Sequence, residues 1–206
     1  MMIKDLGGRV ASVWEGLRPV TRKMLVGALQ SDLSPASSVK KTAAPFDAHA
    51  DWELSRLLSA LDEQSKTKEA RSDTAKLKEI NQLADTCAHL LEVQTASAEV
   101  FIQLAERALQ KHDYKKLDEL ADRLTERFSA GEIAEIIRQS ESVQIRAVAM
   151  ESLVLLPVPA LTGLLDDSLY SGIAAAALEQ KAYEFESDEA RDVLEQYDMT
   201  SGNAEE

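Results

Sequence analysis

The sequence is poor in the residues that mark most small folds. Its 206 residues include one cysteine, eight glycines and five prolines, and aromatic residues make up 5% of it. A single cysteine excludes an internal disulfide and fits a reducing compartment. Few turn-forming residues and no sustained polar–apolar alternation argue against a β-sheet protein. Alanine and leucine are abundant instead, so the composition predicts an all-helical fold.

Long apolar runs and catalytic motifs are missing as well. No apolar run approaches the roughly 20 residues of a membrane-spanning helix, and the N-terminus lacks the apolar core of a secretion signal. The sequence contains no glycine-rich phosphate loop, no His-Glu-x-x-His and no Gly-x-Ser-x-Gly motif. Cys87 and His89 are two residues apart on a helix and would point in different directions. We therefore expect a cytoplasmic protein with no catalytic residues, no metal and no cofactor.

The net charge of −13 is unevenly distributed. Residues 1–30 carry +3, whereas residues 179–206 carry −8. Because an acidic body repels a phosphate backbone, nucleic acid is not an expected partner. The acidic C-terminal region has two interpretations that the sequence leaves open: a solubilising cap on the last helices, or a docking surface for a basic partner.

Residues 1–30 form a basic amphipathic N-terminal arm. One apolar stripe precedes Pro19, and a second follows it. The arm could pack on its own domain, dock on a protein partner, or lie through residues 3–29 on an anionic membrane surface. Its candidate partner-binding residues are Trp14, Arg18 and Arg22. The serine-, alanine- and proline-rich residues 31–50 predict a linker.

Residues 51–112 are expected to form a helical bundle. Asp51 can cap a helix whose leucines recur at helical spacing, and a long helix follows with Cys87 on its buried face. Asp85, His89 and Glu92 share the opposite side of that helix. A metal site in a bundle would need a second helix with such ligands, so a solvent-facing surface is the expectation.

Residues 113–198 repeat a short helical unit. The spacing of Ile133, Ile136 and Ile137 recurs 28 positions later at the leucines from 161 to 165, and again 29 positions after that. It predicts helix pairs 114–128 with 131–140, 142–155 with 158–167, and 169–184 with 187–197. Short helices with one narrow apolar stripe need neighbours, which stacking supplies. The run from Ala174 to Ala177 would let neighbouring helices approach closely.

The segment from Ser142 to Leu153, with Arg146, looks like the first helix of a HEAT-type repeat, and Pro159 to Asp167 looks like the second. Residues 114–197 thus resemble the short bacterial HEAT repeats of the phycobilin-lyase-like group, although Ser171 stands where the next repeat would carry arginine. The resemblance implies an α-solenoid that binds a partner on its concave side. The candidate residues there are Glu132, Glu135, Arg138, Thr162 and Asp166.

These observations predict an all-α protein: an α-solenoid of HEAT-like hairpins, preceded by a helical bundle and the amphipathic arm, and followed by an acidic tail at 199–206. The expected function is non-enzymatic, as a protein–protein interaction scaffold or a subunit of a larger assembly. Two alternatives stay open: a cofactor-handling or lyase-like protein using the concave groove, and a peripheral membrane adaptor using the arm.

Overall fold

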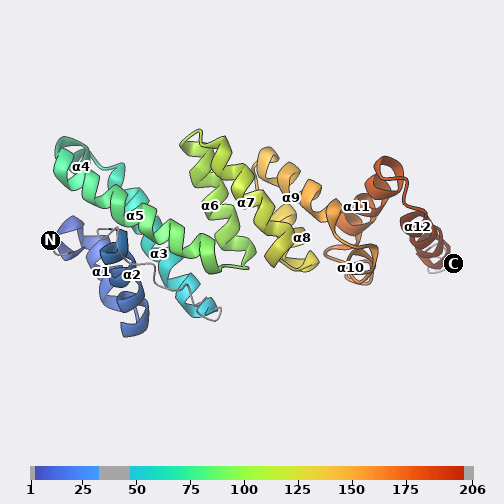
Figure 1. Ribbon diagram of the computed structural model, residues 1–206, viewed down its shortest axis with the longest axis horizontal. Helices are drawn as coiled ribbons and strands as arrows, with labels where there is room; N and C mark the ends of the chain where they lie inside the picture. Colours follow the sequence, from blue (N-terminus) through green and yellow to red (C-terminus); the bar gives the residue numbers. More distant parts are fainter. Residues whose placement is uncertain (1–2, 33–46, 202–206) are drawn as a thin grey trace. The chain divides into compact units, whose positions relative to one another are not determined.

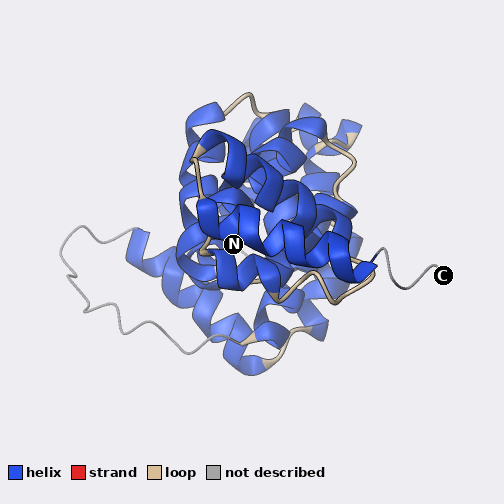
Figure 2. Cartoon of the chain, turned by 90° about the vertical axis from the view of Figure 1, so that its right-hand side faces the viewer, coloured by secondary structure: helices blue, strands red, loops and turns tan. Residues whose placement is uncertain are grey.

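The computed structural model describes residues 3–32 and 47–201, and all the regular structure in these ranges is helical (Figures 1 and 2). The predicted all-α class is therefore confirmed for the described part of the chain. The chain divides into two compact units, Met1–Thr95 and Ala96–Glu206. The second unit begins before residue 113, where the sequence predicts the repeats to start, and that domain boundary stays a prediction.

The first unit is built around two long antiparallel helices, α3 and α5. Leucines of α3 and the Ile80, Leu83 and Leu91 side chains of α5 are buried between them. The leucines of α3 are those of the predicted stripe. The elements of this unit are the 3-10 helix η1 (Ile3–Leu6), α1 (Gly8–Gly16), α2 (Pro19–Asp32), α3 (Ala48–Ser65), α4 (Lys68–Ser72) and α5 (Thr74–Gln94). Cys87 is buried in α5, as its spacing predicted.

The N-terminal arm packs on its own unit. Helix α1 contacts α3, and α2 contacts both α5 and α3. The side chains of Leu6, Val10, Leu17 and Leu25 are buried, whereas Val20, at the start of the second apolar stripe, is 60% exposed. None of the described helices combines the length and the apolar character needed to cross a membrane.

The start of α3 differs from the prediction. Asp47 is the N-cap, and its Oδ1 accepts hydrogen bonds from the backbone N of His49 (3.0 Å) and of Ala50 (3.3 Å). Asp51, which the sequence predicts as the cap, lies inside the helix with 1% of its surface exposed. Its Oδ1 accepts a hydrogen bond from Gln94 Nε2 (3.0 Å), and burial raises the pKa of its carboxyl.

The helices on both sides of the predicted linker extend into it, so the segment between them is shorter than the predicted 20 residues. Ser31 and Asp32 belong to α2, and residues 48–50 belong to α3, because a cap at Asp47 starts that helix one turn early. Residues 33–46 of the predicted linker lie outside the described residues. The same holds for residues 202–206 of the predicted acidic tail, while Met199 to Ser201 belong to the last helix.

The second unit is a series of helices that follow one another in order (Figure 1). Consecutive helices pack as α6 on α7, α8 on α9, α10 on α11 and α11 on α12. Alternate helices also touch, with α7 on α9, α9 on α11, α6 on α8 and α10 on α12. The elements are α6 (Ala98–Gln110), α7 (Tyr114–Arg127), α8 (Ala130–Gln139), α9 (Val143–Leu155), α10 (Val158–Thr162), α11 (Ser171–Glu184) and α12 (Asp188–Ser201).

The helix pairing differs from the prediction for two of the three predicted pairs, whereas the predicted packing of α11 on α12 is observed. The sequence pairs α7 with α8 and α9 with α10, whereas α8 packs most extensively on α9. Both helices bury apolar side chains, including Ile133 and Ile136 of α8 and Ile145 and Leu153 of α9. Periodicity fixes where each helix and its apolar stripe lie, but either neighbour can cover that stripe.

Local signals explain the ends of these helices. Hydroxyl or carboxylate oxygens of Asp113, Ser129 and Ser142 accept hydrogen bonds from backbone amides in the first turns of α7, α8 and α9. Between α6 and α7, His112 has a left-handed φ of 55° that stops the first helix. Helix α10 carries a proline in its first turn, as predicted. It ends at Thr162 rather than at residue 167, because residues 163–166 form a turn.

The alanine run in α11 gives a stability test with a matched control. Ala174 is fully buried and Ala176 is exposed, although both lie in the middle of α11. Because α11 packs on α8, α9, α10 and α12, the substitution Ala174→Leu should lower the free energy of unfolding by about 1–3 kcal/mol. Ala176→Leu should change it by less than about 0.5 kcal/mol. Urea unfolding measures both, and equal effects would contradict this packing.

Candidate functional site

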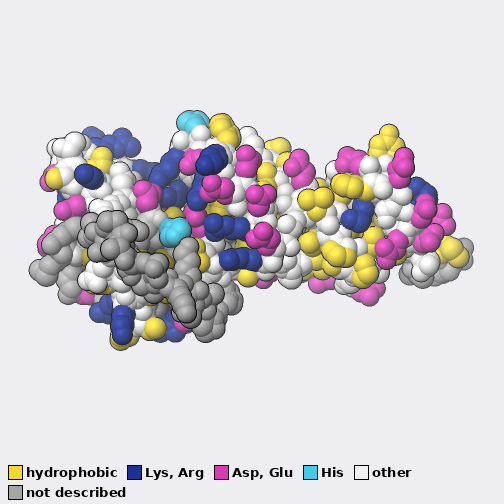
Figure 3. Space-filling view, in the orientation of Figure 1, with side chains coloured by type: hydrophobic (Ala, Val, Ile, Leu, Met, Phe, Trp, Pro, Cys, Tyr) yellow, Lys and Arg dark blue, Asp and Glu magenta, His cyan; other side chains and the backbone are white. Residues whose placement is uncertain are grey.

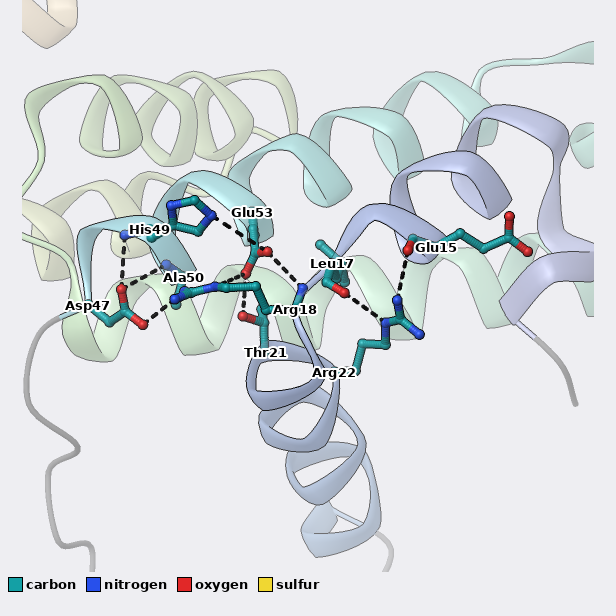
Figure 4. Close-up of polar contacts among 9 residues, drawn as sticks. All are labelled: Glu15, Leu17, Arg18, Thr21, Arg22, Asp47, His49, Ala50 and Glu53. Atoms are coloured by element: carbon teal, nitrogen blue, oxygen red, sulfur yellow. Dashed lines mark hydrogen bonds and ion pairs between the residues drawn. The ribbon is translucent and has the colours of Figure 1, made fainter.

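A polar network joins the N-terminal arm to α3 (Figure 4). Glu53 on α3 is 3% exposed. The backbone N of Arg18 donates to Glu53 Oε1 (2.8 Å), and its Nε donates to Oε2 (3.1 Å). Thr21 Oγ1 also donates to Oε2, and Arg18 Nη2 donates to Asp47 Oδ2 (2.9 Å). Arg18 therefore anchors the start of α2 to α3.

Both carboxyls of this network are held in the ionised form. Burial alone would raise the pKa of Glu53, but hydrogen bonds from Thr21 and Arg18 outweigh it and the pKa lies below its usual value. The hydrogen bond from Arg18 lowers the pKa of Asp47. A general acid or base would need a pKa near the working pH, so these two carboxyls are suited to holding the arm rather than to proton transfer.

The other two candidates on the arm also contact their own unit. Arg22 donates from Nε to Leu17 O (3.0 Å) and from Nη2 to Glu15 O (2.7 Å), which satisfies carbonyls at the end of α1. Its guanidinium lies 5.9 Å from the ring centroid of Trp14. These intramolecular contacts account for Trp14, Arg18 and Arg22, and their partner-binding role stays a prediction.

On α8, Glu135 and Arg138 meet a residue that the sequence analysis did not select. Arg138 donates to Glu135 from Nε (2.7 Å) and from Nη2 (2.5 Å), and the hydroxyl of Tyr170 donates to the same carboxylate (2.9 Å). The hydrogen bond from Arg138 is the main reason that the pKa of Glu135 falls to about 2. Tyr170 is 35 residues away in sequence, and no local pattern connects the two.

The remaining concave-side candidates are not gathered with this pair. Glu132 Oε2 accepts a hydrogen bond from the backbone N of Ala98 (2.8 Å), at the start of α6, where Ser97 provides no side-chain cap. Thr162 Oγ1 donates to the carbonyl of Val158 within α10 (3.0 Å). Asp166 is exposed in the turn after α10. Of the five predicted residues, the structure therefore brings together Glu135 and Arg138.

Cavities in the first unit offer little room for a ligand. The space between α1 and α3, beside Trp52 and Glu53, measures about 130 Å³. Ligand pockets usually enclose about 300–1,000 Å³. A hollow of about 740 Å³ is lined, among the described residues, by the polar face of α5 alone, including Asp85 and His89. A single helix face encloses no ligand.

The predicted solvent-facing side of α5 needs one correction. Glu92 is 6% exposed, so it does not continue the surface that holds Asp85 and His89. Its Oε2 lies 3.9 Å from Nδ1 of His89. Within residues 3–32 and 47–201, no three His, Cys, Asp or Glu side chains are placed to hold a metal ion.

The most distinctive surface of the second unit is apolar. It lies where α9 turns into α10 and where α11 ends, and Figure 3 shows hydrophobic side chains gathered over this part. Leu155 is 59% exposed and Phe185 is 53% exposed. We call this the C-terminal apolar surface. Its members are Leu155, Leu156, Pro157, Pro159 and Phe185.

One side chain holds the two halves of this surface together. Lys181 Nζ donates to the carbonyl of Val154 at the end of α9 (2.8 Å) and lies 5.6 Å from the ring centroid of Phe185. The phenyl ring is therefore held near the end of α9, whose last residue is Leu155. A sequence signal for this surface exists, because residues 152–165 contain no charged residue, but that run also fits a buried helix pair.

Comparison with known proteins gives no family for this chain. A scan of protein-family models found no match, and searches of the curated proteins and of the solved structures found no significant match.

The polar network on the arm predicts a pH-dependent loss of stability. Glu53→Gln should lower the free energy of unfolding at pH 7 by about 1–2 kcal/mol, because a buried charge-assisted acceptor becomes neutral. The folded-state pKa of Glu53 lies below its usual 4.5, so its stabilisation is present above that pH and is lost as the pH falls below it. The difference from wild type should shrink accordingly in denaturant titrations.

Glu63→Gln is the matched control, since Glu63 also lies on α3 and pairs with Arg9 of the arm, but more than half of each side chain is exposed. Exposed pairs stabilise little, so this variant should unfold like wild type. Equal losses for the two variants would show that the buried network does not anchor the arm.

Proposed function

We propose that the protein is a non-enzymatic interaction protein, a scaffold or assembly subunit that binds a protein partner through its C-terminal apolar surface. The observation that carries this proposal is the exposure of Leu155 and Phe185, on two elements that Lys181 links through the Val154 carbonyl and the Phe185 ring, with two exposed prolines at the start of α10. Contiguous exposed apolar patches on folded proteins mark sites of interaction.

In this proposal the second unit is a short α-solenoid of the HEAT type. Its support is the packing of alternate helices, with α7 on α9 and α9 on α11 in one series and α6 on α8 in the other. Repeats that contact mainly their neighbours build such extended binding surfaces. The hairpins are then α6–α7, α8–α9 and α10–α11. The sequence predicted α7–α8, α9–α10 and α11–α12, and of these pairs α11 does pack on α12.

The contacts of the candidate residues favour this function over its alternatives. Glu135 and Arg138, predicted as partner-binding residues on the concave side, bind each other, and Glu135 also binds Tyr170, so neither points to a cofactor. The arm, for which an anionic membrane was one of three interpretations, buries Leu6, Val10, Leu17 and Leu25 within its own unit. A buried single cysteine accords with the reducing cytoplasm as the place where the protein works.

Affinity purification from the cell that makes the protein tests the proposal. The comparison uses the full chain, the double variant L155S/F185S and the control Y114S/V143S, whose two positions are also exposed and apolar but lie outside the surface. Serine is small and polar and fits each exposed position, so all three proteins should show the same helical circular dichroism.

We expect one stoichiometric partner with the wild type and with the control, and its loss with L155S/F185S. The partner, identified by mass spectrometry, should rebuild the complex from purified components with the same dependence on the two residues. Recovery of the same proteins by all three chains, or of none, would contradict the proposed function.

A further inference from the structure

We infer that the C-terminal apolar surface receives a basic amphipathic helix of the partner, a conclusion that rests on the proposed function and specifies its ligand. The apolar face of that helix would cover Leu155 and Phe185. Its lysines or arginines would lie over the acidic residues that surround them.

The charge around the surface sets the sign of the partner. Between residues 147 and 190 the sequence holds eight acidic residues and one cation, Lys181. The ammonium of Lys181 contacts the Val154 carbonyl and the Phe185 ring and keeps its charge, but the eight acidic residues outnumber it and make the local field negative. A partner segment with positive charges is therefore attracted and oriented, and a negatively charged one is repelled.

The acidic residues lie next to the apolar ones. Glu151 is one turn before Leu155 on α9, so the two share a helix face, and Glu151 is exposed. Glu184 and Glu186 flank Phe185 directly, and both are exposed. An apolar centre with a charged rim is the arrangement of protein interfaces, in which the rim contributes specificity and association rate.

A helix fits this surface better than an extended strand. Extended peptides bind by adding to a sheet edge, and the described residues contain no strand. Amphipathic helices instead bind on apolar surfaces between helices, as the turn between α9 and α10 and the end of α11 provide here. The acidic rim also disfavours an anionic membrane as the occupant, because the two surfaces repel each other.

A pair of designed peptides tests the inference on the full-length protein. The probe is a fluorescein-labelled peptide of about 18 residues with leucines at helical spacing and lysines elsewhere. Its control has the same composition with the leucines scrambled, so that charge is kept and the apolar face is lost. Fluorescence anisotropy measures both against the wild type, L155S/F185S, the control Y114S/V143S and E151Q/E186Q.

We expect the patterned peptide to bind at least about tenfold more tightly than the scrambled one. L155S/F185S should lose about tenfold in affinity for the patterned peptide and Y114S/V143S should lose none. E151Q/E186Q should bind more weakly than wild type at low salt and show a shallower salt dependence, because fewer ion contacts are screened.

Three outcomes would overturn the inference. Equal binding of the two peptides would mean attraction by net charge alone. Undiminished binding by L155S/F185S would place the peptide elsewhere. A wild-type dimer in sedimentation analysis that L155S/F185S abolishes would make a second copy of the chain the occupant. Should the peptide fail while the cellular partner still depends on Leu155 and Phe185, the proposed function stands and the basic helix is wrong.

Discussion

Each short helix of the second unit depends on its neighbours to cover its apolar stripe. Helices of 10 to 14 residues, such as α7, α8 and α9, are marginal alone in water. The structure meets this constraint by packing each of them on the next helix or the next but one. Helices α9 and α11 are the most enclosed, because four other helices of the unit contact each of them.

The same constraint explains where the unit leaves apolar surface open. Helix α10 has only five residues, so it cannot cover both the end of α9 and the end of α11. Leu155 and Phe185 remain exposed there, and Lys181 links the end of α9 to the Phe185 ring. The proposed binding surface is thus a consequence of one short helix in a series of longer ones.

In the first unit, polar contacts help to hold the N-terminal arm on α3, in addition to apolar packing. The arm is attached by buried leucines and by Glu53, a buried carboxylate that accepts three hydrogen bonds from Arg18 and Thr21. A buried charge costs free energy unless it is paired and hydrogen-bonded, so the arm and α3 specify each other.

The sequence was a good guide to individual helices and a poor one to their partners. Apolar spacing placed α7, α8 and α9 within two residues of their observed ends, because caps such as Ser129 and Ser142 are local signals. Pairing of α8 with α9 and the bond from Tyr170 to Glu135 depend on tertiary contacts that periodicity does not contain.

Single polar residues show the same limit. Asp47 and Asp51 are both plausible caps by composition, and only the contact of Asp51 with Gln94, at the end of α5, shows that it is buried instead. Glu92 is likewise buried, although its charge predicts a solvent-exposed position on α5. The sequence does not predict the C-terminal apolar surface, because an uncharged run is equally consistent with a buried core and with an exposed surface.

Native-state hydrogen exchange on the full chain tests most directly whether neighbours stabilise these helices. Exchange protection follows the local free energy of opening. The account predicts stronger protection in the middle of α9 and of α11, each contacted by four helices, than in α12, whose main contacts are with α10 and α11. Protection of α9 no greater than that of α12 would contradict it.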